Sequence, residues 1–220
     1  MRAIVGCEFS GVVRRALRAR GVDAWSCDWL ESEDNSPYHI RGDLTDVLRD
    51  GWDLGIFHPP CTYMSNSGVC HLHTDSSRWL KLAEAAEFFL TCWSAPITHV
   101  AVENPVMHKY AKEQIGGIRQ SQVIQPWMFG HKEGKQTCLW LKNLPLLKPT
   151  NNVKAEMMLL PKRERQRLHY LPPGPNRWRE RSRTYSGIAD AMAEQWTAHI
   201  ESAREARKGA EWNTPKHGTR

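Results

Sequence analysis

The chain has 220 residues, of which 40% are hydrophobic and 25% are charged, and its formal net charge is +6. A chain of this length most often forms one domain with a sizeable core. No apolar run approaches the ~18 residues that a membrane span needs, and the amino-terminal stretch is interrupted by Glu8 and lacks the pattern of a secretion signal. We therefore expect a cytoplasmic protein with no membrane partner, whose six scattered cysteines are free thiols.

Strand and helix patterns alternate from the amino terminus onward. Residues 2–5, 23–28 and 53–58 are rich in β-forming side chains and predict three strands. The third is almost continuously apolar, as expected for a strand that is covered on both faces. Between the first two strands, residues 11–21 carry apolar side chains at helical spacing and predict a helix.

The same alternation continues through the middle of the chain. Residues 76–93 have a strong helical period of apolar side chains and predict a long helix. Residues 98–103 and 135–141 predict two further strands. This order predicts a single α/β domain with a doubly wound, mostly parallel sheet, whose core is formed by residues 1–145.

The composition changes after the predicted core. Residues 146–183 form a short Pro-rich segment, within which residues 154–183 hold nine basic and three acidic side chains. Such an excess is typical of a surface that binds a polyphosphate, and a solvated basic face is the alternative. Residues 184–202 predict an amphipathic helix that packs back on the core, and residues 203–220 predict a disordered tail.

Several chemically versatile residues follow the predicted strands. Gly11 lies at the turn after the first strand, Asp28 ends the second, and Asp43, Cys61 and Glu103 follow later segments. In an open parallel sheet, ligands bind beyond the carboxyl ends of the strands, so these residues are expected at one edge. Taken singly, each has a structural alternative: a common turn glycine, helix-capping aspartates, a buried thiol or a surface charge.

Taken together, these segments resemble the motifs of the DNA cytosine-5 methyltransferases, specifically the short phage-type members. Together with Asp28, the matching segments are EFSG (8–11), GDL (42–44), HPPCTYMS (58–65), ENP (103–105), FGHKEGKQTCLWL (129–141) and RTYSGIADAMAEQW (183–196). They run in family order over residues 4–196, and Pro-Cys followed by Glu-Asn is the most specific pair. The resemblance implies a Rossmann-like S-adenosylmethionine-dependent fold, DNA as substrate, and phage-encoded modification that protects DNA from restriction in a bacterial or phage-infected cytoplasm.

The chemistry of this family suits the residues present. Cytosine C5 is a poor nucleophile because it belongs to an aromatic ring. Addition of the Cys61 thiolate to C6 makes C5 an enamine carbon, which can take a methyl group. Glu103 would contact N3 and the exocyclic amine. A thiol with this task is expected to be partly exposed, near positive charge, and lowered in pKa.

The resemblance implies two sets of site residues. The implied catalytic residues are Cys61, Glu103, Pro60, Asn104 and Lys135, where Lys135 or Thr137 replaces an arginine of the larger enzymes. The implied residues for S-adenosylmethionine are Glu8, Phe9, Ser10, Gly11, Asp28, Trp29, Asp43, Leu44 and Pro59.

A base stacked in a duplex is out of reach of Cys61, so the target must be flipped out or single-stranded. The candidate phosphate contacts are Arg163, Arg165, Arg167, Arg177, Arg179, Arg181 and Arg183. Trp178 and Tyr170 could stack on bases or pack internally.

Other interpretations stay open at the level of sequence. No long target-recognition domain separates the last two matching segments, so specificity could be short or supplied by a partner protein. The same chemistry on RNA or a free nucleotide is one alternative, and a catalytically inactive nucleic-acid-binding relative is another. Cys70, His71 and His73 offer zinc ligands, but their spacing is not that of a zinc finger and no metal is expected.

Overall fold

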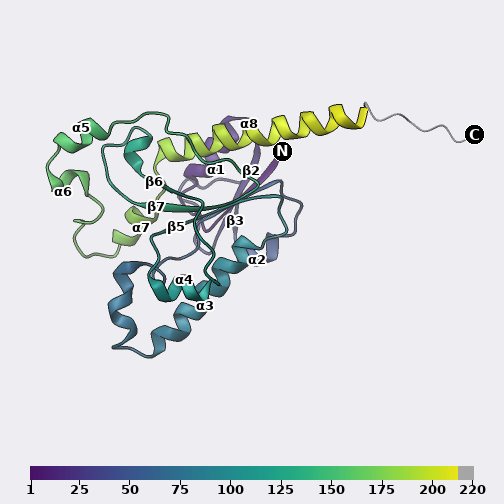
Figure 1. The fold of residues 1–220 in the computed structure, drawn as a ribbon. Helices are drawn as coiled ribbons and strands as arrows, with labels where there is room; N and C mark the ends of the chain where they lie inside the picture. The colour runs from purple at the N-terminus through teal and green to yellow at the C-terminus, as the bar shows by residue number, and fades with distance from the viewer. Residues whose placement is uncertain (213–220) are drawn as a thin grey trace, which may run out of the picture.

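The computed structural model describes residues 1–212, which form a seven-stranded sheet with helices on both faces (Figure 1). The strand order across the sheet is β3-β2-β1-β4-β5-β7-β6. The strands are β1 (Arg2–Gly6), β2 (Asp23–Asp28), β3 (His39–Arg41), β4 (Leu54–Phe57), β5 (His99–Pro105), β6 (Gln122–Ile124) and β7 (Thr137–Lys142). The first five strands pair in parallel, while β7 is antiparallel to β5 and to β6. The predicted α/β, doubly wound, mostly parallel fold is therefore confirmed.

The helices are distributed over both faces of this sheet. The α-helices are α1 (Val12–Ala19), α2 (Leu44–Val47), α3 (Ser77–Trp93), α4 (Lys109–Gln114), α5 (Lys154–Leu159), α6 (Lys162–Arg165), α7 (Arg177–Ser182) and α8 (Ser186–Trp212), and the short 3-10 helices are η1 (Asn66–Leu72) and η2 (Pro126–Met128). Helices α1 and α8 cover one face, and α2, α3 and α4 cover the other (Figure 1). None of the helices within residues 1–212 is long and apolar enough to cross a membrane.

The central strands are buried on both faces because their side chains alternate between two cores. Ala3 and Val5 of β1 pack with Leu54 and Ile56 of β4 beneath α1 and α8, whereas Ile4 points to the opposite core beneath α3. A period of two with apolar residues on both sides explains why these strands are continuous apolar runs in the sequence.

The end of the chain differs from its prediction. Residues 203–212, predicted as part of a disordered tail, instead continue α8 to Trp212. Arg204 of this extension forms an ion pair with Asp53 (2.5 Å), which ties it to the start of β4. The rest of the predicted tail, residues 213–220, lies outside the described residues.

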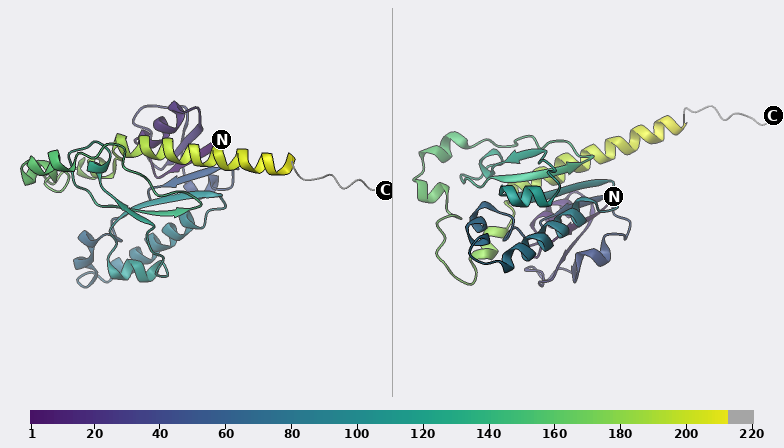
Figure 2. Two further views of the ribbon diagram at one scale, coloured as in Figure 1. Left: turned by 45° about the horizontal axis from the view of Figure 1, so that its top comes forward. Right: turned by 60° about the horizontal axis from the view of Figure 1, so that its bottom comes forward.

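Helices α5, α6 and α7 lie in the basic segment. Figure 2 shows α5 and α6 at the end of the molecule opposite the far end of α8. The two edge strands β3 and β6 were not predicted, because three residues are too few to show a strand period.

Candidate active site

The cysteine loop begins where β4 ends. The amide of His58 donates to the carbonyl of Gly6 (3.0 Å), which continues the pairing of β4 with β1 by one residue. Pro59 and Pro60 follow with restricted backbones, and the carbonyl of Cys61 then accepts from the amides of Met64 and Ser65 (3.1 and 3.0 Å). Cys61 therefore lies in a well-defined turn beyond the carboxyl end of β4.

The neighbouring strand β5 supplies Glu103 and Asn104. Asn104 is 1% exposed, and its Nδ2 donates to the carbonyl oxygen of Pro59 (3.0 Å). The carboxylate of Glu103 faces His58, with 3.1 Å between Oε2 and Nδ1. The structure thus brings the two residues of the predicted Cys–Glu pair to the same edge of the sheet, Cys61 in the turn after β4 and Glu103 on the adjacent parallel strand β5.

The electrostatic environment of Cys61 differs from the prediction. Burial raises the pKa of the Cys61 thiol, and the charge of Glu103 raises it further, while Lys135 and Arg181 lower it. The predicted proximity to positive charge is present, but the predicted lowering of the thiol pKa is wrong. The physical reason is that desolvation and the nearby carboxylate outweigh the two cations.

The pKa of Glu103 is shifted in the opposite direction from that of Cys61. Burial raises its pKa, but the hydrogen bond with His58 and the charges of Lys135 and His58 lower it, and the net pKa lies below the usual value. Glu103 is therefore ionised at neutral pH despite its burial.

Lys135 lies just before β7 and adds a positive charge near Cys61 and Glu103. Its Nζ donates to the backbone carbonyl of Arg181 (2.8 Å), and its amide donates to Gln125 Oε1 (2.9 Å). Its charge acts on both Cys61 and Glu103. Thr137, the alternative for this position, is buried in β7 and donates to the carbonyl of Lys135 (3.4 Å).

The turn between β1 and α1 is built around a glycine. Gly11 has φ 64°, and a Cβ atom there would lie 2.3 Å from Nη2 of Arg14. Glu8 is buried, and its carboxylate accepts from the amides of Val13 (2.6 Å) and Arg14 (3.2 Å). It therefore caps the N-terminus of α1, a role that the sequence prediction of a ligand contact did not include.

Four further residues of the predicted cofactor set lie at the end of β2 and the start of α2. Asp28 ends β2, with Oδ1 accepting from the amide of Leu30 (2.9 Å), and burial raises its pKa. Trp29 is 68% exposed beside it. Asp43 caps α2 by accepting from the amide of Thr45 (2.8 Å), and Leu44 is buried in the core.

Helix α7 lies against the β1–α1 turn. Phe9 is buried and packs on Trp178, with ring centroids 5.5 Å apart, and the guanidinium group of Arg179 lies over both rings. Arg183 pairs with Glu33 through two hydrogen bonds (2.8 and 2.7 Å). The basic segment is thus joined to the predicted cofactor side of the molecule, a contact that no local sequence pattern indicates.

The seven arginines predicted to contact phosphates have different surroundings. Arg167 and Arg183 are in ion pairs with Glu133 and Glu33. Arg177 donates to the carbonyls of Leu171 and His169, and Arg165 contacts Met158 Sδ. Within residues 1–212, Arg165, Arg177 and Arg179 form no ion pair but contact other groups, whereas the side chains of Arg163 and Arg181 form neither an ion pair nor a hydrogen bond or ring contact. Phosphate binding by this segment stays a prediction, with these two as the most available contacts.

The Cys70–His73 stretch covers the end of η1 and the residue that follows it. The ring of His73 packs edge-on against Trp79 and Tyr110. Over the described part of the chain, no three His, Cys, Asp or Glu side chains form a group that could hold a metal ion.

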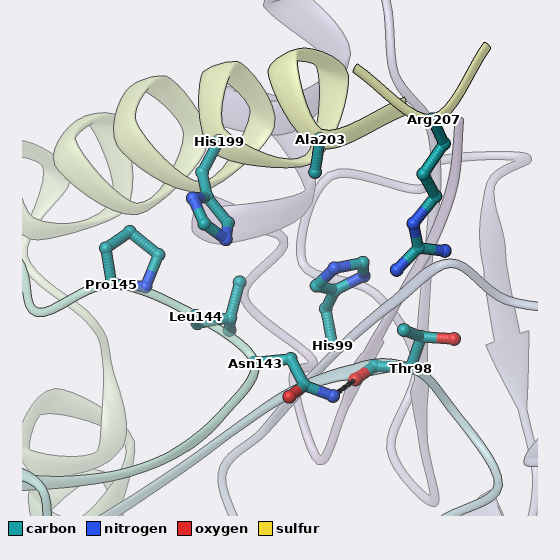
Figure 3. A pocket seen from close by; sticks show the side chains of 8 residues that line it. All are labelled: Thr98, His99, Asn143, Leu144, Pro145, His199, Ala203 and Arg207. Atoms are coloured by element: carbon teal, nitrogen blue, oxygen red, sulfur yellow. Dashed lines mark hydrogen bonds between the residues drawn. The ribbon is translucent and has the colours of Figure 1, made fainter. Parts of the chain in front are cut away.

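A separate cavity of about 430 Å³ lies at the opposite edge of the sheet, where β5 begins (Figure 3). Its lining includes His99, His199, Asn143 and Arg207. Burial lowers the pKa of His99, and His199 and Arg207 contribute in the same direction. None of the predicted site residues lines this cavity.

Three solved structures resemble the chain at low identity. A proposed DNA modification methyltransferase encoded within an E. coli prophage has a TM-score of 0.44 and 16% identity, over 74% of this chain and 56% of its own. A mutant of Spodoptera frugiperda DNMT2 gives 0.39 and 14%, over 68% and 53%. The bifunctional kinase-methyltransferase WbdD gives 0.38 and 14%, over 66% and 35%.

The chain therefore spans about half of the length of the prophage protein and of DNMT2, and about a third of the length of WbdD. No family model and no curated protein matches the chain. Similarity at this level does not extend to a substrate or to the role of a residue, so the function rests on the geometry of the site.

Proposed function

We propose that this protein transfers a methyl group from S-adenosylmethionine to C5 of cytosine in DNA, with Cys61 as the nucleophile. The observation that carries the proposal is the placement of Cys61, in the turn that follows β4, and of Glu103, on the adjacent parallel strand β5, at the same carboxyl edge of the sheet. Asn104 supports it by joining the two elements through the carbonyl of Pro59. A thiol and a carboxylate so placed can act on one planar ring.

The residues would divide the work as follows. The sulfur of Cys61 bonds to C6 of the cytosine, and the electron pair of the C5–C6 double bond becomes available at C5. Ionised Glu103 accepts a hydrogen bond from the exocyclic amine and holds the ring edge. Lys135 and Arg181 favour the thiolate, since both lower the pKa of Cys61. Once C5 has taken the methyl group, loss of its proton and cleavage of the sulfur–carbon bond restore the C5–C6 double bond of the ring and the Cys61 thiolate.

The residues at the β1–α1 turn fit the proposed donor. In dinucleotide-binding folds the N-terminus of this helix holds a pyrophosphate. Here the Glu8 carboxylate already occupies the amides of Val13 and Arg14, so the turn suits a ligand without phosphates. S-adenosylmethionine, when bound, supplies the methyl group that C5 accepts. Gly11, Phe9, Asp28, Trp29 and Asp43 are the residues that would hold it.

The proposed substrate must present an extruded or single-stranded base to Cys61. Arg181 contributes positive charge at this thiol, and Arg163 adds exposed charge on α6. Both are suitable for phosphate contacts, which would make DNA binding weaken as salt rises.

The test is methyl transfer from labelled S-adenosylmethionine to duplex DNA, single-stranded DNA, RNA and dCMP. Cys61→Ala should abolish transfer, whereas Cys70→Ala, which changes an exposed cysteine on η1, should retain it. Label in DNA supports the proposal. Label in RNA or dCMP alone would replace DNA as the substrate, and no label in any acceptor would contradict the proposed function.

A further inference from the structure

We propose that His58 is a positioning residue that holds the Glu103 carboxylate in place through Nδ1 and turns Nε2 toward a bound ligand. The inference rests on the proposed function, because His58 would position the Glu103 carboxylate that is proposed to hydrogen-bond the cytosine ring. The sequence resemblance gives His58 no role.

The position of His58 follows from the strand register. Phe57 of β4 pairs with Val102 of β5, so the next residues along these parallel strands, His58 and Glu103, are neighbours. The side chains of His58 and Glu103 are 8% and 17% exposed, and 3.1 Å separates Nδ1 from Oε2. Because an ionised carboxylate can only accept, Nδ1 must carry a hydrogen and donate it in the hydrogen bond to Glu103 Oε2.

The backbone of His58 is held on both sides of the residue. Its amide is bonded to Gly6, and the following residue is Pro59, whose carbonyl is held by Asn104. An imidazole on a backbone held in this way can present Nδ1 to the carboxylate from a fixed starting point. This differs from a surface pair, where two mobile side chains gain little from meeting.

The second ring nitrogen supplies the independent observation. Nε2 of His58 is buried and has no hydrogen-bond partner among the described residues. A buried polar atom without a partner is costly, so such atoms commonly mark a missing water or ligand. The charge of His58 also lowers the pKa of Glu8 and Asp28, against the raising effect of burial.

Two substitutions separate the two nitrogens. The amide nitrogen of asparagine can occupy the place of Nδ1, and that of glutamine the place of Nε2. His58→Asn therefore keeps a donor toward Glu103, whereas His58→Gln removes it. His169→Gln, on an exposed histidine of the basic segment, is the matched control.

The first readout is the pKa of Glu103, followed by carboxyl ¹³C NMR and assigned by the signal lost in Glu103→Gln. It should stay below the usual glutamate value in the wild type, in His58→Asn and in the control, and rise by about one unit or more in His58→Gln, where burial is less opposed. Equal values in the Asn and Gln variants would overturn the proposal.

The second readout is turnover. His58→Gln should lower kcat by about tenfold to a hundredfold, and His58→Asn should recover at least part of that loss. No recovery of kcat by His58→Asn would overturn the positioning role.

If His58→Gln does not fold, imidazole ¹⁵N NMR of the wild type takes its place. Nδ1 should be protonated, with a chemical shift that changes in Glu103→Gln. An unprotonated Nδ1 would overturn the proposal. The NMR arms need no turnover, so a wild type without methyl transfer would end the proposed function while they still decide the role of His58.

Discussion

Asn104 donates from Nδ2 to the carbonyl of Pro59 (3.0 Å), so the strand with the glutamate and the loop with the cysteine are held together by one buried hydrogen bond. This contact makes Asn104 the mechanical link between Cys61 and Glu103. The contribution of this hydrogen bond to stability and to methyl transfer can be measured without changing Cys61 or Glu103.

Asn104→Ala should reduce methyl transfer by about tenfold or more, because the cysteine loop loses its fixed position, and should cost about 1–3 kcal/mol, because the Pro59 carbonyl stays buried without a partner. Chemical denaturation and the transfer assay measure the two effects. Asn143→Ala is the control: it also removes an amide-to-carbonyl bond (to Thr98, 2.8 Å) and has a left-handed backbone (φ 54°). It should lose stability and keep activity; equal activity losses in both variants would contradict the prediction.

The reactivity of Cys61 should depend on pH in a way set by its two charged neighbours. Because the pKa of the thiol is raised, alkylation by iodoacetamide should still be accelerating above pH 9. Lys135→Met removes a group that lowers this pKa and should slow alkylation at a given pH, whereas Glu103→Gln should accelerate it. Mass spectrometry of the Cys61 peptide gives the rates, with the Cys70 peptide as internal reference. A change in the same direction in both variants would refute the electrostatic account.

Asp34 should stabilise the fold through buried Arg14. Arg14 is 1% exposed and donates to Asp34 Oδ1 at 2.6 Å. Burial raises the pKa of Asp34, but hydrogen bonds from Arg14, Ser32 and Arg15 lower it well below its usual value. Asp34→Asn leaves the buried Arg14 charge without its carboxylate, but solvent at the exposed side of Asp34 screens the pair, so the substitution should cost about 1–3 kcal/mol at pH 7.

The pH dependence of this effect has a definite sign. An acid with a lowered pKa in the fold contributes stability above its unfolded pKa, near 4, and loses it as the pH falls through the folded pKa. The difference in free energy of unfolding between wild type and Asp34→Asn, measured by denaturant titration, should therefore shrink below about pH 4. Asp23→Asn, at an exposed ion pair with Arg2 (3.5 Å), should cost at most about 1 kcal/mol. A gap that does not change with pH would argue against the Arg14–Asp34 pair as its source.

Gly187 should be intolerant of any side chain. A Cβ atom at this position would lie 2.0 Å from the carbonyl oxygen of Phe129. The amide of Gly187 also donates to Nε2 of His131 (3.0 Å). Gly187→Ala must push the start of α8 away from this segment and should cost about 1–3 kcal/mol, or more if the backbone cannot move. Gly174→Ala, which meets no atom within 4 Å, should leave the melting temperature nearly unchanged. Similar melting temperatures for the two variants would contradict this packing.

Local patterns were enough to predict most of the fold. The strand at residues 23–28 matches β2 residue for residue, because its ends are marked by a glycine turn and an aspartate. The rule that reactive residues follow the carboxyl ends of parallel strands placed Asp28, Cys61 and Glu103 correctly at one edge.

What the sequence did not predict depends on contacts between distant segments. The packing of Trp178 on Phe9 joins residues far apart in the chain, and the neighbours of His58 depend on the register of β4 against β5. The raised pKa of Cys61 arises from burial and from Glu103, a strand away. None of these leaves a periodic signal, so sequence patterns could not reveal them.

The central claim is that the sulfur of Cys61 bonds to C6 of cytosine. The direct measurement is covalent trapping on duplex DNA that carries 5-fluorocytosine, in the presence of S-adenosylmethionine, because fluorine at C5 blocks the proton loss that releases the enzyme. We expect a denaturation-resistant protein–DNA complex for the wild type and for Cys70→Ala, with the crosslink mapped to Cys61, and none for Cys61→Ala. Methyl transfer to ordinary cytosine without any such complex, or a crosslink that persists in Cys61→Ala, would contradict it.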